Sequence, residues 1–232
     1  FVIEDAAQGL MSKYKGRSLG SIGHIGCLSF HETKNYQCGE GGAILLNNSS
    51  LIERAEIIRE KGTNRSQFVK GQIDKYTWVD IGSSYLPSEI VSAFLWAQLQ
   101  EVRSITKRRI EIWNKYHNAF HELAQEKKII RPFIPESCLH NAHMYYLLFK
   151  DIKQRKYFIE SMKNKGIECY FHYVPLHLSL GGERYGRIHG SICNTHDLSK
   201  KLVRLPLWVG LDADYVISQA LNTISTFKEY DF

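Results

Sequence analysis

A single lysine stands in a short loop whose surroundings could make it a nucleophile. Lys34 lies in the stretch SFHETKNYQCGEGG, residues 29–42, between an apolar segment and a cluster of glycines. A lysine amine attacks a carbonyl group once it has lost its proton, and partial burial or a nearby positive charge promotes that loss. Most lysines in such loops are simply solvated, so the interpretation depends on what other groups the sequence places near Lys34.

A carboxylate at the end of the first expected strand could complete such a site. The chain begins FVIEDAAQG, in which three β-forming residues precede Glu4 and Asp5, and Gln8 follows one turn later. Ligands of α/β proteins gather at the carboxyl ends of strands. In pyridoxal chemistry a lysine holds the cofactor while a carboxylate pairs with the protonated ring nitrogen. Asp5 and Lys34 meet these requirements, although such a pair also occurs by chance in many proteins.

The first hundred residues predict short strands and one helix around this loop. Strands are expected over 24–30 and 41–48, which flank the lysine. A helix is expected over 49–62, because its apolar residues recur at helical spacing, a capping-box pattern begins at Ser50, and Gly62 suits the end of a helix.

Two longer segments follow. Residues 63–87 show no clear periodicity and are rich in Gly, Ser, Asn and aromatic residues, which predicts a long loop of the kind that is often functional. Residues 88–120 keep an apolar face at helical spacing, which predicts a long helix or a bent pair of helices that bridges two domains.

The last hundred residues predict a second, smaller unit that follows a linker over 131–143. Its expected elements are a strand over 144–150, a helix over 152–165 with Asp151 as cap and Gly166 as stop, and a strand over 167–173. The order strand, helix, strand favours a small α/β domain.

Composition excludes several classes of function. The 232 residues are 44% hydrophobic and 23% charged, as in ordinary globular domains. No apolar run has the length that spans a bilayer, and the chain does not open as a signal peptide does. The net charge is +6, but the basic runs at 103–109 and 150–165 resemble solvated helix faces, and no nucleic-acid-reading module is visible. We expect a cytoplasmic protein with neither a membrane nor a nucleic-acid partner.

The cysteines and histidines do not predict a metal site. The five cysteines are widely spaced and form no CxxC pair, which argues for a reducing compartment and against zinc or a disulfide framework. His143, His172 and His177 have no cysteine or carboxylate partner at ligand spacing. They remain either histidines with ordinary hydrogen bonds or contacts to a substrate.

Three motifs in a fixed order carry a family resemblance. EDAAQG, then GHIGCLSFHETKN, then GEGG resemble the DegT/DnrJ/EryC1/StrS family of nucleotide-sugar aminotransferases, and the resemblance extends over essentially the whole chain, including NAHMYY (141–146) and FHYVPLH (171–177). It implies the fold type I of pyridoxal-phosphate-dependent transferases, like that of aspartate aminotransferase, an α/β fold. The expected domains are the remainder of a cofactor-binding large domain over 1–105 and a small C-terminal α/β domain with the bridging helix over 106–232.

The resemblance also implies roles for single residues. Lys34 falls on the lysine that forms the Schiff base with pyridoxal 5'-phosphate and shuttles a proton between cofactor and sugar. Asp5 falls on the partner of the ring nitrogen, Gln8 on a residue near the ring and its 3-hydroxyl, and Ser29 on a side chain near the phosphate. Some relatives replace this lysine by histidine and act as dehydratases, so Lys34 indicates a transaminase.

One loop departs from the family pattern. Many members place an asparagine from the neighbouring subunit on the cofactor phosphate, in a GxNxR loop. Here residues 82–86 read GSSYL, so Ser84 stands in the asparagine position and Leu86 in the arginine position. A serine can still donate a hydrogen bond. The residues that the resemblance places in the substrate cleft are Asn64, Arg65, His143, Tyr145, His172 and His177.

The segment 59–86 narrows the expected substrate. It resembles the transaminases that convert dTDP-4-oxo-6-deoxyglucose to dTDP-4-amino-4,6-dideoxygalactose for enterobacterial common antigen, with glutamate as the usual amino donor and a homodimer as the usual assembly. We also expect the chain to lack an N-terminal part that family members carry. Two alternatives stay open, a nucleotide-sugar aminotransferase of another specificity and a non-catalytic remnant that only associates with other subunits.

Overall fold

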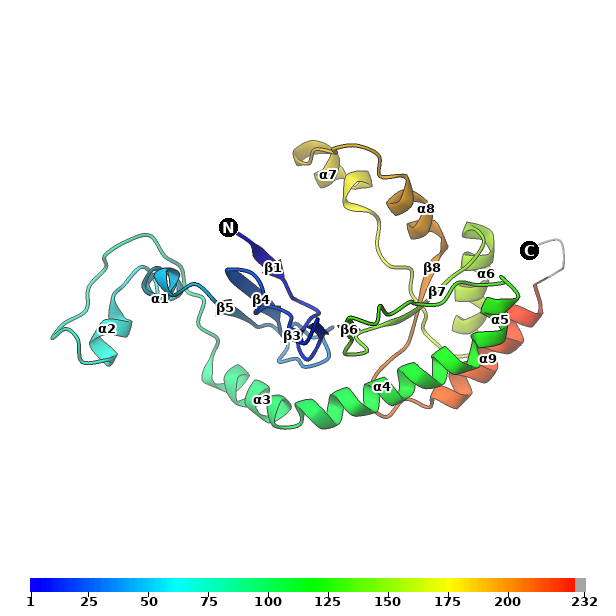
Figure 1. The fold of residues 1–232 in the computed structure, drawn as a ribbon, viewed down its shortest axis with the longest axis horizontal. Helices are drawn as coiled ribbons and strands as arrows, with labels where there is room; N and C mark the ends of the chain where they lie inside the picture. Colours follow the sequence, from blue (N-terminus) through cyan, green and yellow to red (C-terminus); the bar gives the residue numbers. More distant parts are fainter. Residues whose placement is uncertain (228–232) are drawn as a thin grey trace. The chain divides into compact units, whose positions relative to one another are not determined.

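The chain divides into two units, and the computed structural model describes residues 1–227 (Figure 1). The first unit consists of Phe1–Thr106 together with Pro135–Asn141. The second consists of Lys107–Ile134 and the chain from Ala142 onward.

The first unit is built around a three-stranded sheet in the order β1-β4-β5. Its strands are β1 (Ile3–Asp5), β4 (Ile25–Ser29) and β5 (Gly42–Leu46). β1 runs parallel to β4, and β5 runs antiparallel to β4 (Figure 1). The predicted strands on both sides of the lysine loop are confirmed.

A second small sheet contains β3 (Arg17–Ser18), β2 (Lys13–Tyr14) and β6 (Cys138–Leu139), with antiparallel pairing throughout. β6 comes from the segment that the sequence predicted as a linker. This pairing places 135–141 in the first unit, more than a hundred residues after the strand with which β6 pairs.

Two glycines allow the turn before β4 to lie against the strand. Gly20 has φ +87°, a left-handed conformation that favours glycine. A Cβ atom added to Gly26 would lie 2.1 Å from the carbonyl oxygen of Gly20, closer than any side chain tolerates. The turn and the strand therefore touch through their main chains.

The helix predicted over 49–62 is shorter than expected and begins differently. A 3-10 turn, η1 (Ser49–Leu51), precedes α1 (Ile52–Arg59). The expected cap at Ser50 is wrong, because Asn48 caps the turn and its Oδ1 accepts from the Ser50 N–H at 3.0 Å. The predicted stop is confirmed, since Gly62 has φ +73° and its N–H donates to Ile57 O at 2.9 Å.

The segment 63–87 is mostly loop, as predicted, and holds one short helix, α2 (Arg65–Val69). The region 88–120 forms two helices, α3 (Glu89–Gln100) and α4 (Val102–Ala119), which break at Glu101. The expected bent pair is thus present. A further short helix, α5 (His121–Gln125), follows in the second unit.

The second unit contains a two-stranded antiparallel sheet of β7 (Tyr145–Leu148) and β8 (Leu202–Leu205). Its other elements are α6 (Ile152–Lys163), the 3-10 turn η2 (Leu176–Leu178), α7 (Leu180–Tyr185), α8 (Cys193–Lys201) and α9 (Ala213–Ser225). Asp151 caps α6 by accepting from two N–H groups, and Gly166 follows it with φ +74°, as predicted.

The strand predicted over 167–173 is wrong. Within this segment only Tyr170 pairs with another strand, through an isolated bridge to Arg204 of β8. Tyr173 has φ +59°, which interrupts an extended chain. The partner of β7 is therefore β8, so the order is not the expected strand, helix, strand.

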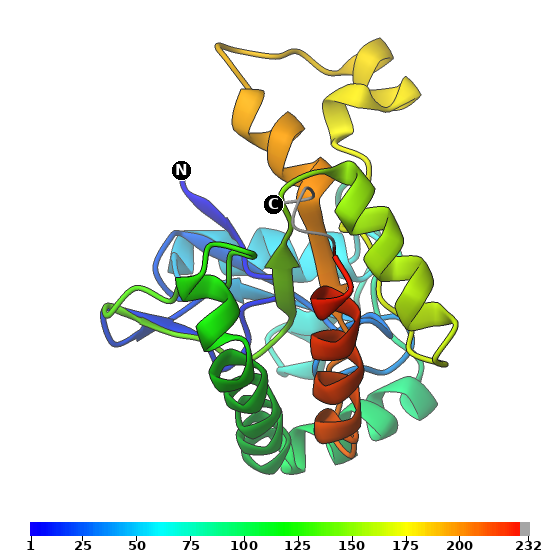
Figure 2. The same cartoon turned by 90° about the vertical axis from the view of Figure 1, so that its right-hand side faces the viewer.

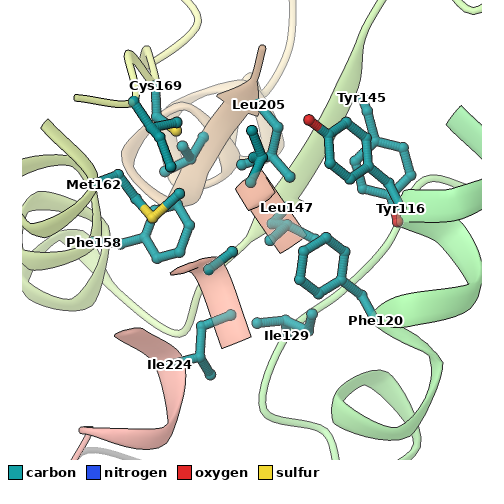
Figure 3. Close-up of a cluster of buried hydrophobic side chains, with 14 of the residues drawn as sticks. Tyr116, Phe120, Ile129, Tyr145, Leu147, Phe158, Met162, Cys169, Leu205 and Ile224 are labelled. Atoms are coloured by element: carbon teal, nitrogen blue, oxygen red, sulfur yellow. The ribbon is translucent and has the colours of Figure 1, made fainter. Parts of the chain in front are cut away.

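The core of the second unit is formed by β7, β8 and the helices packed on them. In Figure 2, α6 and α9 lie side by side. Figure 3 shows Met162 next to the ring of Phe158, with Leu147 and Leu205 from the two strands among the labelled side chains. Phe158, Met162 and Leu147 are fully buried. This cluster is the main source of hydrophobic stabilisation in the second unit.

We expect Phe158→Ala to lower the free energy of unfolding by about 3–5 kcal/mol, because the change leaves a cavity in this core. The matched control is Phe133→Ala, whose ring is 81% exposed, and which should change the free energy of unfolding by no more than about 0.5 kcal/mol. Urea unfolding of the two variants measures both values. Equal losses would contradict the assignment of the core.

Candidate functional site

The predicted cofactor residues of the first unit lie at one edge of its sheet. Because β1 and β4 are parallel, their carboxyl ends meet at the same edge, with Asp5 opposite Cys27 in the register. Ser29 is the last residue of β4, and Lys34 follows five residues later in the loop to β5. The strand pairing therefore brings the end that bears Asp5 next to the start of the lysine loop.

The Asp5 carboxylate is exposed and only partly used within the chain. Its Oδ1 accepts from the N–H of Ala7 at 3.2 Å, which starts the turn after β1. Among residues 1–227, no other group bonds to its carboxylate. One oxygen thus fixes the side chain, and the other can meet a cationic or N–H group of a ligand.

The lysine loop folds back on itself through main-chain hydrogen bonds. Phe30 N–H donates to Gly41 O at 2.8 Å, and Cys38 N–H donates to Phe30 O at 2.9 Å. Lys34 N–H donates to His31 O at 2.9 Å. The Lys34 side chain is half-buried, and its Nζ forms neither an ion pair nor a hydrogen bond with any described residue. The loop is ordered, while the amine stays available.

Ser29 ends the strand before the lysine loop, and Gln8 lies in the turn after β1. The hydroxyl of Ser29 accepts from the His31 N–H at 3.3 Å. Gln8 is exposed in the turn after β1, where its carbonyl oxygen accepts from Asn141 Nδ2 at 2.8 Å. In the part of the chain that the structure describes, its side-chain amide has no hydrogen-bond partner.

Glu4 was not singled out from the sequence, yet it fixes the strand that bears Asp5. Its carboxylate accepts from the N–H groups of Gly20 at 2.8 Å and of Ile22 and Gly23 at 2.5 Å each. These hydrogen bonds, that of Gly23 most, hold the pKa of Glu4 below its ordinary value. The sequence signal for this role was the pair Gly20 and Gly23, which indicates a tight turn. The N–H groups of such a turn can cluster around a carboxylate.

Three residues expected to meet cofactor or substrate lie in the segment 59–86, where two of them brace the loop. Asn64 Oδ1 accepts from the Thr77 N–H at 2.8 Å. Arg65 Nη1 pairs with Glu60 Oε1 at 2.6 Å, and Glu60 is nearly buried. Ser84 is exposed and forms an isolated bridge with Glu60.

The remaining predicted substrate residues belong to the second unit. His143 is half-buried, and its carbonyl accepts from Arg109 Nη2 at 2.9 Å. His177 is half-buried in η2. His172 Nδ1 lies 3.4 Å from Arg204 Nη1, and burial, together with the charge of Arg204, lowers the pKa of His172.

Tyr145 is placed differently from its expected role. Its side chain has no exposed surface and packs against the ring of Trp113. It also packs against the rings of Tyr116 and Phe120 (Figure 3). A side chain without exposed surface cannot contact a dissolved substrate in this arrangement. We therefore assign Tyr145 to the core of the second unit.

No group of three or more His, Cys, Asp or Glu side chains within residues 1–227 could hold a metal ion. In the same part of the chain, every helix is too short or too polar to cross a membrane.

Comparison with known proteins connects this arrangement with a family. The model of the DegT/DnrJ/EryC1/StrS aminotransferase family matches residues 1–221. The uncharacterized protein MJ1066 of Methanocaldococcus jannaschii is 31% identical over 224 residues, which are 94% of this chain and 57% of that protein. The spore coat polysaccharide biosynthesis protein SpsC of Bacillus subtilis is 26% identical over 93% of this chain and 57% of that protein. The chain thus spans just over half the length of these relatives.

Solved structures show the fold. Helicobacter pylori PseC, an aminotransferase involved in the biosynthesis of pseudoaminic acid, matches with a TM-score of 0.83 at 22% identity over 97% of this chain and 60% of that one. The PLP form of the sugar aminotransferase Spr1654 of Streptococcus pneumoniae matches with a TM-score of 0.78 at 23% identity over 96% and 57%. The predicted fold type I of pyridoxal-phosphate-dependent transferases is confirmed.

We expect Glu4→Gln to flatten the pH dependence of stability. The pKa of Glu4 is lowered by folding, so its charged form contributes stability above the ordinary value of 4.5, and this contribution is lost as the pH falls through the lowered pKa. The variant should unfold at lower urea concentration at neutral pH and approach the wild type in acid. Glu32→Gln, at an exposed position in the lysine loop, is the control. Parallel pH profiles for wild type and Glu4→Gln would contradict the role of Glu4.

Proposed function

The chain belongs to the DegT/DnrJ/EryC1/StrS aminotransferase family, and we propose that it is the lysine-bearing part of a pyridoxal-phosphate-dependent aminotransferase. The proposed substrate is a nucleotide-linked keto sugar. The observation that carries the proposal is Lys34. Its half-buried amine has no partner among residues 1–227, and its loop begins at the sheet edge where Asp5 ends a parallel strand.

The donor set suits pyridoxal phosphate. An amine that is not held in an ion pair can form a Schiff base with an aldehyde. The Asp5 carboxylate, with one oxygen not bonded within the described chain, can pair with a protonated pyridine nitrogen. The hydroxyl of Ser29 and the amide of Gln8 can donate to the anionic oxygens of the phosphate and the ring. In our proposal Ser84 serves the phosphate of a neighbouring subunit in a homodimer.

Each residue has a distinct task in the reaction. When bound, pyridoxal phosphate supplies an electron sink that lets a proton leave the carbon next to the transferred amine. Lys34 holds the cofactor and, as a neutral amine, accepts and returns a proton at Nζ. Asp5 keeps a proton on the ring nitrogen by pairing with it. Gln8 and Ser29 would orient the cofactor between Lys34 and Asp5.

The substrate proposed within this class is dTDP-4-oxo-6-deoxyglucose, aminated at C4 with glutamate as donor to give dTDP-4-amino-4,6-dideoxygalactose for a cell-surface polysaccharide such as enterobacterial common antigen. The resemblance of residues 59–86 supports it. The names of SpsC and PseC favour a second candidate, another nucleotide sugar of polysaccharide or pseudoaminic acid biosynthesis. His143, His172 and His177 are the proposed sugar contacts, and Asn64 and Arg65 shape the loop. A diphosphate contact by Arg65 would use the guanidinium N–H groups that do not bond to Glu60.

We expect pyridoxal phosphate followed by borohydride to label Lys34 in the purified chain. Borohydride fixes a Schiff base as a stable amine, so peptide mass spectrometry identifies the labelled lysine. Lys34→Ala should lose the label and the visible absorbance band of the bound cofactor. Lys107→Ala, at an exposed helix position, is the matched control and should keep both. Asp5→Asn should keep the label and lower amino transfer by about a hundredfold or more, because an amide cannot hold the ring proton by charge.

A folded, soluble chain that gains no label on Lys34 would overturn the proposal for this chain and favour a remnant that only associates with other subunits. Folding of this sample is checked by circular dichroism before the label is sought.

The substrate is decided by a direct comparison of nucleotide sugars. We expect kcat/KM for dTDP-4-oxo-6-deoxyglucose to exceed that for UDP-linked keto sugars by about tenfold or more, since polar contacts to the correct substrate leave groups unpaired with the wrong one. Mass spectrometry of the product detects the transferred amine. A higher kcat/KM with a UDP-linked sugar would select the second candidate.

A further inference from the structure

We propose that Asn141 is a positioning residue of this site, which holds the turn that bears Gln8 and the loop that bears Lys34 in one fixed relation. The inference rests on the proposed function for the meaning of these two segments. The contacts themselves lie within the first unit and do not depend on a cofactor.

The side chain of Asn141 ties down the Gln8 turn. It is 4% exposed, and its Nδ2 donates to the carbonyl oxygens of Gln8 and Leu10 at 2.8 Å each. The same turn ends at Met11, whose φ of +70° costs energy in a residue other than glycine. Two hydrogen bonds from one amide group therefore stabilise a turn that is unfavourable by itself.

The main chain of Asn141 ties down the lysine loop. Its carbonyl oxygen accepts from Asn35 Nδ2 at 2.9 Å, and Asn35 is the residue directly after Lys34. The next residue, Tyr36, is 2% exposed and bonds through its hydroxyl to Thr106 Oγ1. Thr106 already donates to Val102 O at 2.5 Å, so Tyr36 is the donor. The two residues that follow Lys34 are thus held by segments far away in the sequence.

Asparagine is the residue type that this position requires. Its amide nitrogen carries two N–H groups, and both are needed to meet two carbonyl oxygens. Aspartate has the same shape but would place a carboxylate against those oxygens. Asn141 holds one segment through its side chain and the other through its main chain. Loss of the side-chain bonds frees residue 141 to shift, and a shift of its carbonyl weakens the bond from Asn35 as well. Reacting groups lose rate steeply when they are misplaced by about 1 Å, so such a tie supports catalysis without touching the substrate.

The test compares three variants. Asn141→Asp removes the donors to the Gln8 turn and disturbs the carbonyl that receives Asn35. Asn35→Asp removes the hydrogen bond from the lysine loop to the carbonyl oxygen of Asn141 and leaves the side chain of Asn141 unchanged. Asn47→Asp is the matched control, because Asn47 Nδ2 also donates to two carbonyl oxygens of the first unit, those of Gly20 at 2.9 Å and Gly23 at 3.0 Å.

The main readout is amide hydrogen exchange without cofactor. Asn141→Asp should speed exchange about tenfold or more at the hydrogen-bonded amides of both the Gln8 turn and the lysine loop. Asn35→Asp should speed exchange only in the lysine loop. Asn47→Asp should change exchange in neither the Gln8 turn nor the lysine loop. Acylation of the Lys34 amine by a water-soluble reagent, followed by mass spectrometry, should quicken in the first two variants and stay unchanged in the control.

The second readout uses pyridoxal phosphate. Asn141→Asp should lower the affinity of Lys34 labelling about tenfold, more than Asn47→Asp does. Exchange and acylation in the lysine loop that remain as in the wild type would overturn the inference. If Asn141→Asp does not fold, Asn35→Asp decides by the same two measurements. If the wild type gains no label on Lys34 while Asn141→Asp still speeds exchange in both segments, the proposed function is wrong. The positioning role of Asn141 is then still supported.

Discussion

The parallel pairing of β1 with β4 is the constraint on which the candidate site depends. Parallel strands bring their carboxyl ends to one edge, so Asp5 and the start of the lysine loop become neighbours although the intervening chain forms a separate small sheet. Had β1 paired antiparallel, Asp5 would lie at the opposite edge from Ser29. The pairing is held from one side by Glu4, whose three N–H donors come from the turn that leads into β4. A structural acid, Glu4, and the acid proposed to meet the cofactor, Asp5, thus stand side by side in the sequence.

The lysine loop combines order with an available amine. Its main chain is closed by hydrogen bonds of Phe30 to Gly41 and Cys38, and the residues after Lys34 are anchored to Asn141 and Thr106. An amine on a loose loop would lose conformational entropy each time it held a cofactor. An amine locked in an ion pair would need its partner removed first. In this loop neither cost applies, because the backbone is ordered by neighbours while Lys34 Nζ has no bond to any described residue.

Much of the first sheet and of α6 could be predicted from the sequence, since local signals decide these elements. β-forming residues mark the strands, and Asp151 with Gly166 marks the ends of a helix. The cap at Ser50 failed because Asn48 caps the preceding turn, and its Oδ1 accepts from both the N–H and the hydroxyl of Ser50. The strand over 167–173 failed because β7 finds its partner about sixty residues later, in β8. The role of Asn141 could not be predicted for a similar reason. Its hydrogen-bond partners Asn35 and Gln8 lie 106 and 133 positions away in the sequence.

The residues of the motif NAHMYY (141–146) differ in burial and in the neighbours that they contact. Within NAHMYY, Asn141 closes the loops of the first unit, while Tyr145 fills the aromatic core of the second. His143 lies between them, half-buried, with its carbonyl held by Arg109. A short motif of this kind therefore serves two units at once, because adjacent residues must satisfy the packing of different neighbours. Only His143 of these three keeps a partly exposed side chain, so a substrate that reaches this segment would meet the histidine rather than the tyrosine.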